Sequence, residues 1–131
     1  MQPKEGSPGG NAMAHSPIEY HRVSKRLRAA TGYLELGMTQ HALDSLDGLA
    51  ETGPFHAAAE FLRGEALRLQ RRFDAAAVHF AAAARAFPEP HDRSAWLALS
   101  QCLRGVGDDD SALDMLARAR GAKPQSLPPA F

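Results

Sequence analysis

The stretch Gly64–Pro88, GEALRLQRRFDAAAVHFAAAARAFP, decides the fold of this chain. Its small, large and turn residues follow a fixed order: Gly64, Leu67, Phe73, Ala76, Phe80, Ala83 and Pro88. The apolar positions have helical spacing on both sides of the Arg71-Arg72 corner. Alanine-rich helices propagate well and let their neighbours approach closely. The stretch therefore predicts two helices joined by a short turn.

The same pattern recurs before and after this stretch. Corresponding residues line up in three windows, at offsets of 34 and then 36 residues. The columns are Tyr33, Leu67 and Leu103; Ala42, Ala76 and Ala112; Leu46, Phe80 and Leu116; Leu49, Ala83 and Ala119; and Pro54, Pro88 and Pro124. A single hairpin of this kind cannot bury its apolar stripe, so stacked neighbours must cover it. The chain is therefore predicted to be an array of three similar hairpins.

Local start and stop signals predict where the helices begin and end. Ser16-Pro17 opens the first helix, because Ser caps a helix start and Pro fits the first helical position. Gly37 ends the first helix and Gly53-Pro54 ends the second, since Gly tolerates a left-handed turn and Pro cannot continue a helix. The predicted helices cover about residues 17–36, 39–52, 55–70, 73–86, 93–104 and 108–120.

These columns resemble the tetratricopeptide repeat pattern W-x2-L-G-x2-Y…A-x3-F…P. The third unit matches it best, with Trp96, Leu99, Ser100, Leu103, Ala112, Leu116 and Pro124. The resemblance covers about residues 23–126 and implies an all-α, right-handed α-solenoid of three helix–turn–helix repeats, with six antiparallel helices. The chain departs from the pattern at Arg26, Glu60 and Arg63, which stand in columns that the family normally buries. We therefore expect the first and third helices to be more solvent-facing at these positions.

The resemblance divides the chain into a repeat domain and two tails. The domain is predicted over residues 16–124, with repeats at about 23–56, 57–90 and 93–126. Residues 1–15 are rich in Gly, Pro and Ser and are predicted to be disordered, because they bury little apolar surface. Residues 125–131 are predicted to form a Pro-rich tail. The sequence leaves open whether Met1 or Met13 is the start.

Composition bounds the function. The 131 residues include 15 basic and 15 acidic side chains, whereas nucleic-acid binding needs a concentrated basic surface. No apolar run approaches the length of about 20 residues that spans a bilayer. Cys102 is the only cysteine, so an intramolecular disulfide is impossible, and we expect a buried, inert thiol. These features predict a cytoplasmic protein that neither binds nucleic acid nor inserts into a membrane.

The resemblance also implies where a partner protein binds. In this family the first helix of each unit lines a concave groove. The matching positions here are Leu27, Thr31, Leu34, Glu35, Phe61, Glu65, Arg68, Leu69, Leu97, Gln101 and Arg104. Leu27, Phe61 and Leu97 share one column and could form an apolar ladder. The alternative is that some of these residues only pack between adjacent helices.

Several other activities find no support in the sequence. A subclass of the family binds C-terminal carboxylates of chaperones through Lys, Asn and Arg. The matching positions here lack those groups: Leu27, Thr31, Leu62, Ser94 and Ala98. The six histidines are scattered without the spacing of a zinc motif, and no nucleophile, phosphate-binding or dinucleotide motif is present. We expect no catalysis, no metal and no cofactor.

Two functions remain open. The first is a scaffold or adaptor that binds a peptide or helix of a partner protein in the groove. The second is a small chaperone similar to those of type III secretion, holding an apolar client segment. A further expectation concerns the last helix, because nothing follows it to cover Leu113. Either Leu127 and Phe131 fold back over it, or a second copy does, forming a homodimer.

Overall fold

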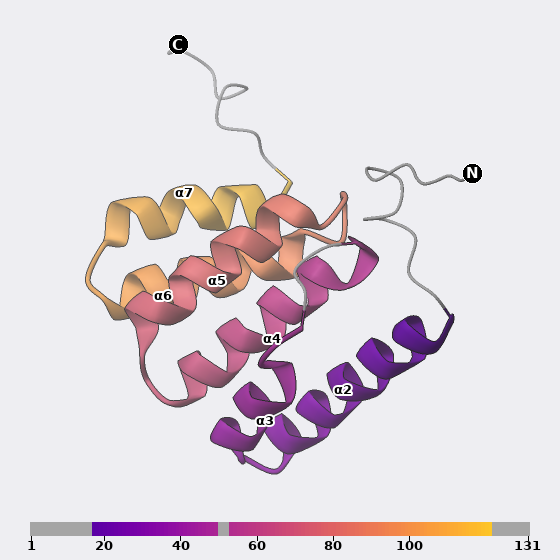
Figure 1. Ribbon diagram of the computed structural model, residues 1–131. Coiled ribbons are helices and arrows are strands. Elements are labelled where there is room, and N and C mark those ends of the chain that lie inside the picture. Colours follow the sequence, from indigo (N-terminus) through magenta and orange to yellow (C-terminus); the bar gives the residue numbers. More distant parts are fainter. Residues whose placement is uncertain (1–16, 50–52, 122–131) are drawn as a thin grey trace.

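The computed structural model describes residues 17–49 and 53–121, and within them every regular element is helical. The elements are α2 (Pro17–Glu35), α3 (Thr39–Leu46), the 3₁₀ turn η1 (Gly53–Phe55), α4 (His56–Leu69), α5 (Phe73–Ala86), α6 (Arg93–Gly105) and α7 (Asp109–Ala119). The pairs α2–α3, α4–α5 and α6–α7 form hairpins that stack in chain order, with α2 and α3 at one end and α6 and α7 at the other (Figure 1). The predicted all-α stack of three hairpins is confirmed. The tails, and with them Pro124, Leu127 and Phe131, lie outside the described residues.

The three hairpins turn in the same way. A backbone N–H donates to the carbonyl five residues earlier in each turn, from Met38 to Tyr33, from Arg72 to Leu67 and from Asp108 to Leu103, at 2.8–2.9 Å. The accepting residues form one repeat column, and a bond of this span is typical of a left-handed helix C-terminus. The left-handed residues are Gly37, Arg71 and Gly107, with φ angles of 76°, 63° and 93°. Repetition of the sequence thus produces repetition of the turn.

Small residues let the helices of a hairpin approach closely. Ala42, Ala76 and Ala112, one column of the repeat, are all buried. Gly64 faces the ring of Phe80, and a Cβ atom at Gly64 would lie 2.8 Å from that ring. Because Phe80 is fully buried, the ring has little room to yield. Glycine at position 64 is therefore required for α4 and α5 to pack this closely.

The prediction that the second helix runs to Gly53-Pro54 is wrong. Helix α3 ends at Leu46, the next residue has an extended backbone with ψ 137°, and Gly48 has a φ of 79°. Gly48 tolerates this left-handed conformation, which stops the helix early. Leu49 lies beyond the helix and is nevertheless buried, in a core cluster with Ala30, Ala42, Leu46 and Ala66.

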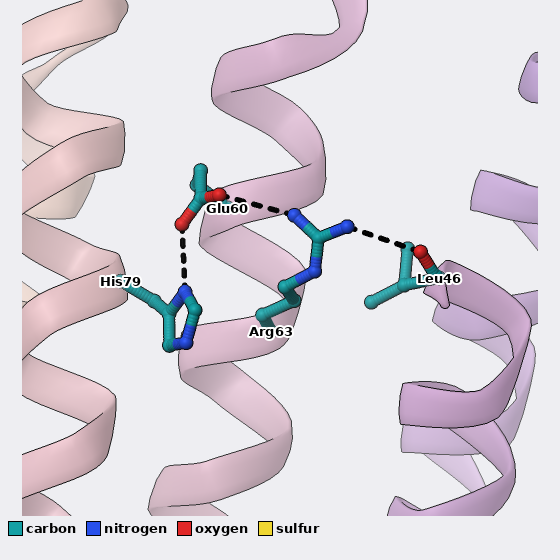
Figure 2. A network of polar contacts seen from close by, with 4 residues as sticks. All are labelled: Leu46, Glu60, Arg63 and His79. Carbon is teal, nitrogen blue, oxygen red and sulfur yellow. Dashed lines mark hydrogen bonds and ion pairs between the residues drawn. The ribbon is translucent and has the colours of Figure 1, made fainter. Parts of the chain in front are cut away.

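The expectation that Glu60 and Arg63 face solvent is also wrong. The Glu60 residue is 8% exposed and the Arg63 side chain 14%. Arg63 Nη1 donates to Glu60 Oε2 at 3.0 Å, Arg63 Nη2 donates to the Leu46 carbonyl at 3.0 Å, and His79 Nδ1 lies 2.7 Å from Glu60 Oε1. Figure 2 shows how Glu60 and Arg63 connect α4 with the helices on both of its sides. A buried polar network therefore occupies two apolar columns of the repeat.

Arg26, the third departure from the pattern, completes the end of α3. Its Nε donates to the Ser45 carbonyl at 2.9 Å and its Nη2 to the Asp47 carbonyl at 2.7 Å. Together with the bond from Arg63 to Leu46, three consecutive carbonyls at this helix end accept from side chains of other helices. Helix ends leave carbonyls without intrahelical partners. The two arginines therefore make the early end of α3 tolerable.

Candidate functional site

The first helix of each hairpin carries the predicted groove residues, and their exposure varies. Thr31, Glu35, Leu69, Leu97, Gln101 and Arg104 are exposed. Leu34, Glu65 and Arg68 are half-buried, as are Leu27 and Phe61. These side chains lie on α2, α4 and α6, and we refer to the set as the inner face. A role of these residues in partner binding stays a prediction.

Two residues of the predicted apolar ladder pack inside the protein and the third is exposed to solvent. Leu27 packs in a cluster with Leu62 of α4, and Phe61 packs against a cluster containing Ala95 of α6. In each case the cluster includes a buried alanine from the first helix of the next unit. Leu97, the next residue of the column, lies in the last unit and is 41% exposed. Leu27 and Phe61 therefore serve the stack, and Leu97 is the exposed member.

Glu65 and Arg68 form an ion pair in the middle of the inner face, with Arg68 Nη2 2.5 Å from Glu65 Oε1. Both side chains keep about a quarter to a third of their surface exposed, at 26% and 34%. Burial raises the pKa of the Cys102 thiol, on α6, to about 11. The charge of Arg68 lowers this pKa and that of Glu65 raises it, and both effects are smaller than that of burial. The buried, protonated thiol that the sequence predicted is thus the state favoured at neutral pH.

Cys102 provides a test of this burial. In the native protein at pH 8, we expect its thiol to react with Ellman's reagent more than about 100-fold slower than in urea-unfolded protein, since the raised pKa removes thiolate and burial blocks access. The folded pKa lies above the ordinary value of 9.0, so the stabilising contribution is present below pH 9.0 and is lost as pH rises towards about 11. The stability loss over that range should be smaller in Cys102→Ala. Equal reactivity of native and unfolded protein would contradict the prediction.

A groove of about 450 Å³ lies between α6 and α7, at the end of the stack. Its walls are Leu97, Ser100, Gln101 and Arg104 from α6, and Asp109, Ala112, Leu113 and Leu116 from α7. The structure thus brings three of the predicted residues together with side chains of the second helix. The prediction missed the contribution of α7 because it took groove positions only from first helices. The exposure expected for Leu113 is present, at 65%.

Other kinds of site receive no support from the described residues. In residues 17–49 and 53–121, no three His, Cys, Asp or Glu side chains are grouped so that they could hold a metal ion. Within the same ranges, none of the helices combines the length and the apolar character needed to cross a membrane. The predicted residues lie on two exposed surfaces of the described part of the chain, the inner face and the α6–α7 groove.

The comparisons with known proteins agree with the hairpin stack. Two family models match the chain, both described as tetratricopeptide repeat, one over residues 27–89 and the other over residues 67–130. Together they cover all six helices apart from the first part of α2. No curated protein and no solved structure matches the chain.

Proposed function

Because the chain belongs to the tetratricopeptide repeat family, we propose that it is a non-catalytic module that binds another protein along the inner face. Repeats of this family typically mediate protein–protein interaction, which supports the general role. The finer proposal is that the partner contributes a helix or an extended peptide. Such segments bind grooves through apolar side chains at regular spacing.

Leu69 carries this proposal. It is an apolar side chain 47% exposed near the C-terminal end of α4, next to Arg68 in sequence. On α6, Gln101 and Arg104 are exposed on the same inner face. An exposed leucine beside basic and amide groups fits a partner with an apolar anchor flanked by acidic side chains. We propose that Leu69 is the anchor site and that Arg68 and Arg104 form its polar rim.

Leu69→Glu tests the anchor. A charge in place of an apolar anchor is expected to weaken partner binding by at least about 30-fold, the size of a hot-spot loss of 2 kcal/mol. The matched control is Val78→Glu, because Val78 is also apolar, 67% exposed and helical, but lies on α5. Proteins that co-purify with the wild type are identified by mass spectrometry, and each affinity is then measured by calorimetry. A partner that binds Leu69→Glu and Val78→Glu equally well would reject the inner face.

The same experiment separates two forms of the function. A scaffold or adaptor should yield several stable subunits, whereas a chaperone of the type III secretion class should yield one client that is unstable alone. The chaperone form is supported by the exposed leucines of two first helices, Leu69 and Leu97, and by exposed Leu36 just after α2. The single buried cysteine supports a cytoplasmic location for either form.

A further inference from the structure

Helix α7 carries a symmetric pattern of charge and apolar side chains on one face. Asp109, Leu113, Leu116 and Arg120 follow one another at intervals of four, three and four residues, which places them on one stripe of the helix and its C-cap. Asp109 and Arg120 are exposed, Leu113 is 65% exposed and Leu116 is half-buried. The stripe is thus acidic at its start, apolar in the middle and basic at its end.

We propose that this stripe binds the same stripe of a second copy of the chain, with the two α7 helices antiparallel. The midpoint between Leu113 and Leu116 is also the midpoint between Asp109 and Arg120. A twofold axis through that point brings Asp109 of each copy to Arg120 of the other, and Leu113 to Leu116. A twofold interface uses one surface patch on both copies, so the patch must be complementary to itself. The stripe meets this requirement in both charge and apolar character.

The surroundings of α7 support the same arrangement. The groove beside the stripe is walled on its other side by Leu97 and Gln101 of α6, and it offers about 450 Å³ next to the projecting Leu113. Leu113 of a second copy can therefore fill an apolar recess and need not lie on a flat surface. The antiparallel orientation also places the positive end of each helix dipole beside the negative end of the other.

A second copy fits the stripe better than an unrelated partner does. Arg118, the other arginine near the end of α7, has its guanidinium 4.8 Å from the centre of the Trp96 ring and is engaged within the protomer. Arg120 lies two residues further on, on the stripe, and is exposed. An unrelated partner does not require acidic and basic side chains at matching positions on one stripe. A homodimer does, because one helix must supply both halves of every contact.

The experiment measures the oligomeric state of the full chain by sedimentation velocity over a range of concentrations. We expect the wild type to dimerise reversibly. Leu113→Glu should weaken dimerisation by at least about tenfold, because a charge replaces an apolar contact that occurs twice. Asp109→Arg and Arg120→Asp should each weaken it by about tenfold, since each creates two like-charge pairs.

The decisive samples combine the two charge reversals. The double variant Asp109→Arg/Arg120→Asp should dimerise like the wild type, because every pair is again of opposite charge. A mixture of the two single variants should form a heterodimer, since each copy then supplies the charge that the other needs. Circular dichroism of each variant checks that the helices are intact, so a loss of folding cannot imitate a loss of dimer.

Other outcomes would overturn the proposal. A wild type that stays monomeric up to about 1 mM, where even weak complexes form, excludes the homodimer. A Leu113→Glu variant that is less stable as a monomer shows that the chain itself covers the stripe. Dimers that persist unchanged in all three single variants place the interface elsewhere. None of these results bears on Leu69, so the proposed anchor site is tested separately.

Discussion

Replacing Arg63 by methionine is expected to lower the free energy of unfolding by about 3–5 kcal/mol, the usual cost of removing one partner from a buried ion pair. The Glu60 carboxylate would stay buried without its guanidinium partner, and the Leu46 carbonyl would lose the bond from Arg63 and keep the one from the Leu49 N–H. Small domains are stable by only about 5–15 kcal/mol, so this change consumes much of the total. Urea unfolding followed by circular dichroism measures it.

Two controls show whether the network causes the loss. Arg104→Met removes the same charge from an exposed position and should change stability by less than about 0.5 kcal/mol. The double variant Glu60→Leu/Arg63→Met puts apolar side chains into columns that the repeat normally fills with them. It should be more stable than Arg63→Met alone, since no unpaired carboxylate is left buried. An Arg63→Met protein as stable as the wild type would show that the network contributes nothing.

Phe61→Glu is expected to unfold much of the protein and not merely to block a partner. The Phe61 ring centre lies 5.3 Å from that of Phe80 and 6.3 Å from that of Phe87, so a carboxylate would enter the packing between α4 and α5. Burying an unpaired charge there costs several kcal/mol, which corresponds to a fall in melting temperature of roughly 10 °C or more. Thermal unfolding followed by circular dichroism gives the value.

The same substitution at Leu69 is the matched control, because Leu69 lies on the same helix and is 47% exposed. Its melting temperature should stay within a few degrees of the wild type, as is usual for surface positions. If Phe61→Glu melts like Leu69→Glu, then Phe61 is a surface side chain, and it returns to the apolar ladder as a candidate binding residue.

Most of the fold could be predicted because short-range sequence signals that recur in each repeat determine it. Gly37 and Gly107 end their helices because glycine readily adopts the left-handed conformation found there. The alanine columns predict where helices pack closely. The start of α5 at Phe73 and its end at Ala86 were predicted to the residue. Each of these signals acts within a few residues of the place that it determines.

The errors arose where distant residues decide the outcome. Gly48 alone does not determine the early end of α3, because carbonyls at that end bind Arg26 and Arg63, which are 17 to 21 residues away. The burial of Glu60 depends on His79 of the next helix. Phe61 and Leu97 share a column, yet within residues 17–49 and 53–121 only Phe61 is followed by another hairpin that packs against it. No local pattern carries this information, because it belongs to the assembled stack.

The binding of α3 carbonyls by Arg26 and Arg63 has a consequence for cooperativity. In a linear array, each unit has its own stability and a coupling to its neighbours. Here α3 is only eight residues long and completes its C-terminal end with donors from α2 and α4. Two of these three bonds, from Arg26, lie within the first hairpin, and the third, from Arg63, joins it to the second. Opening of α4 should consequently remove a donor from the end of α3, which couples the unfolding of the first two hairpins.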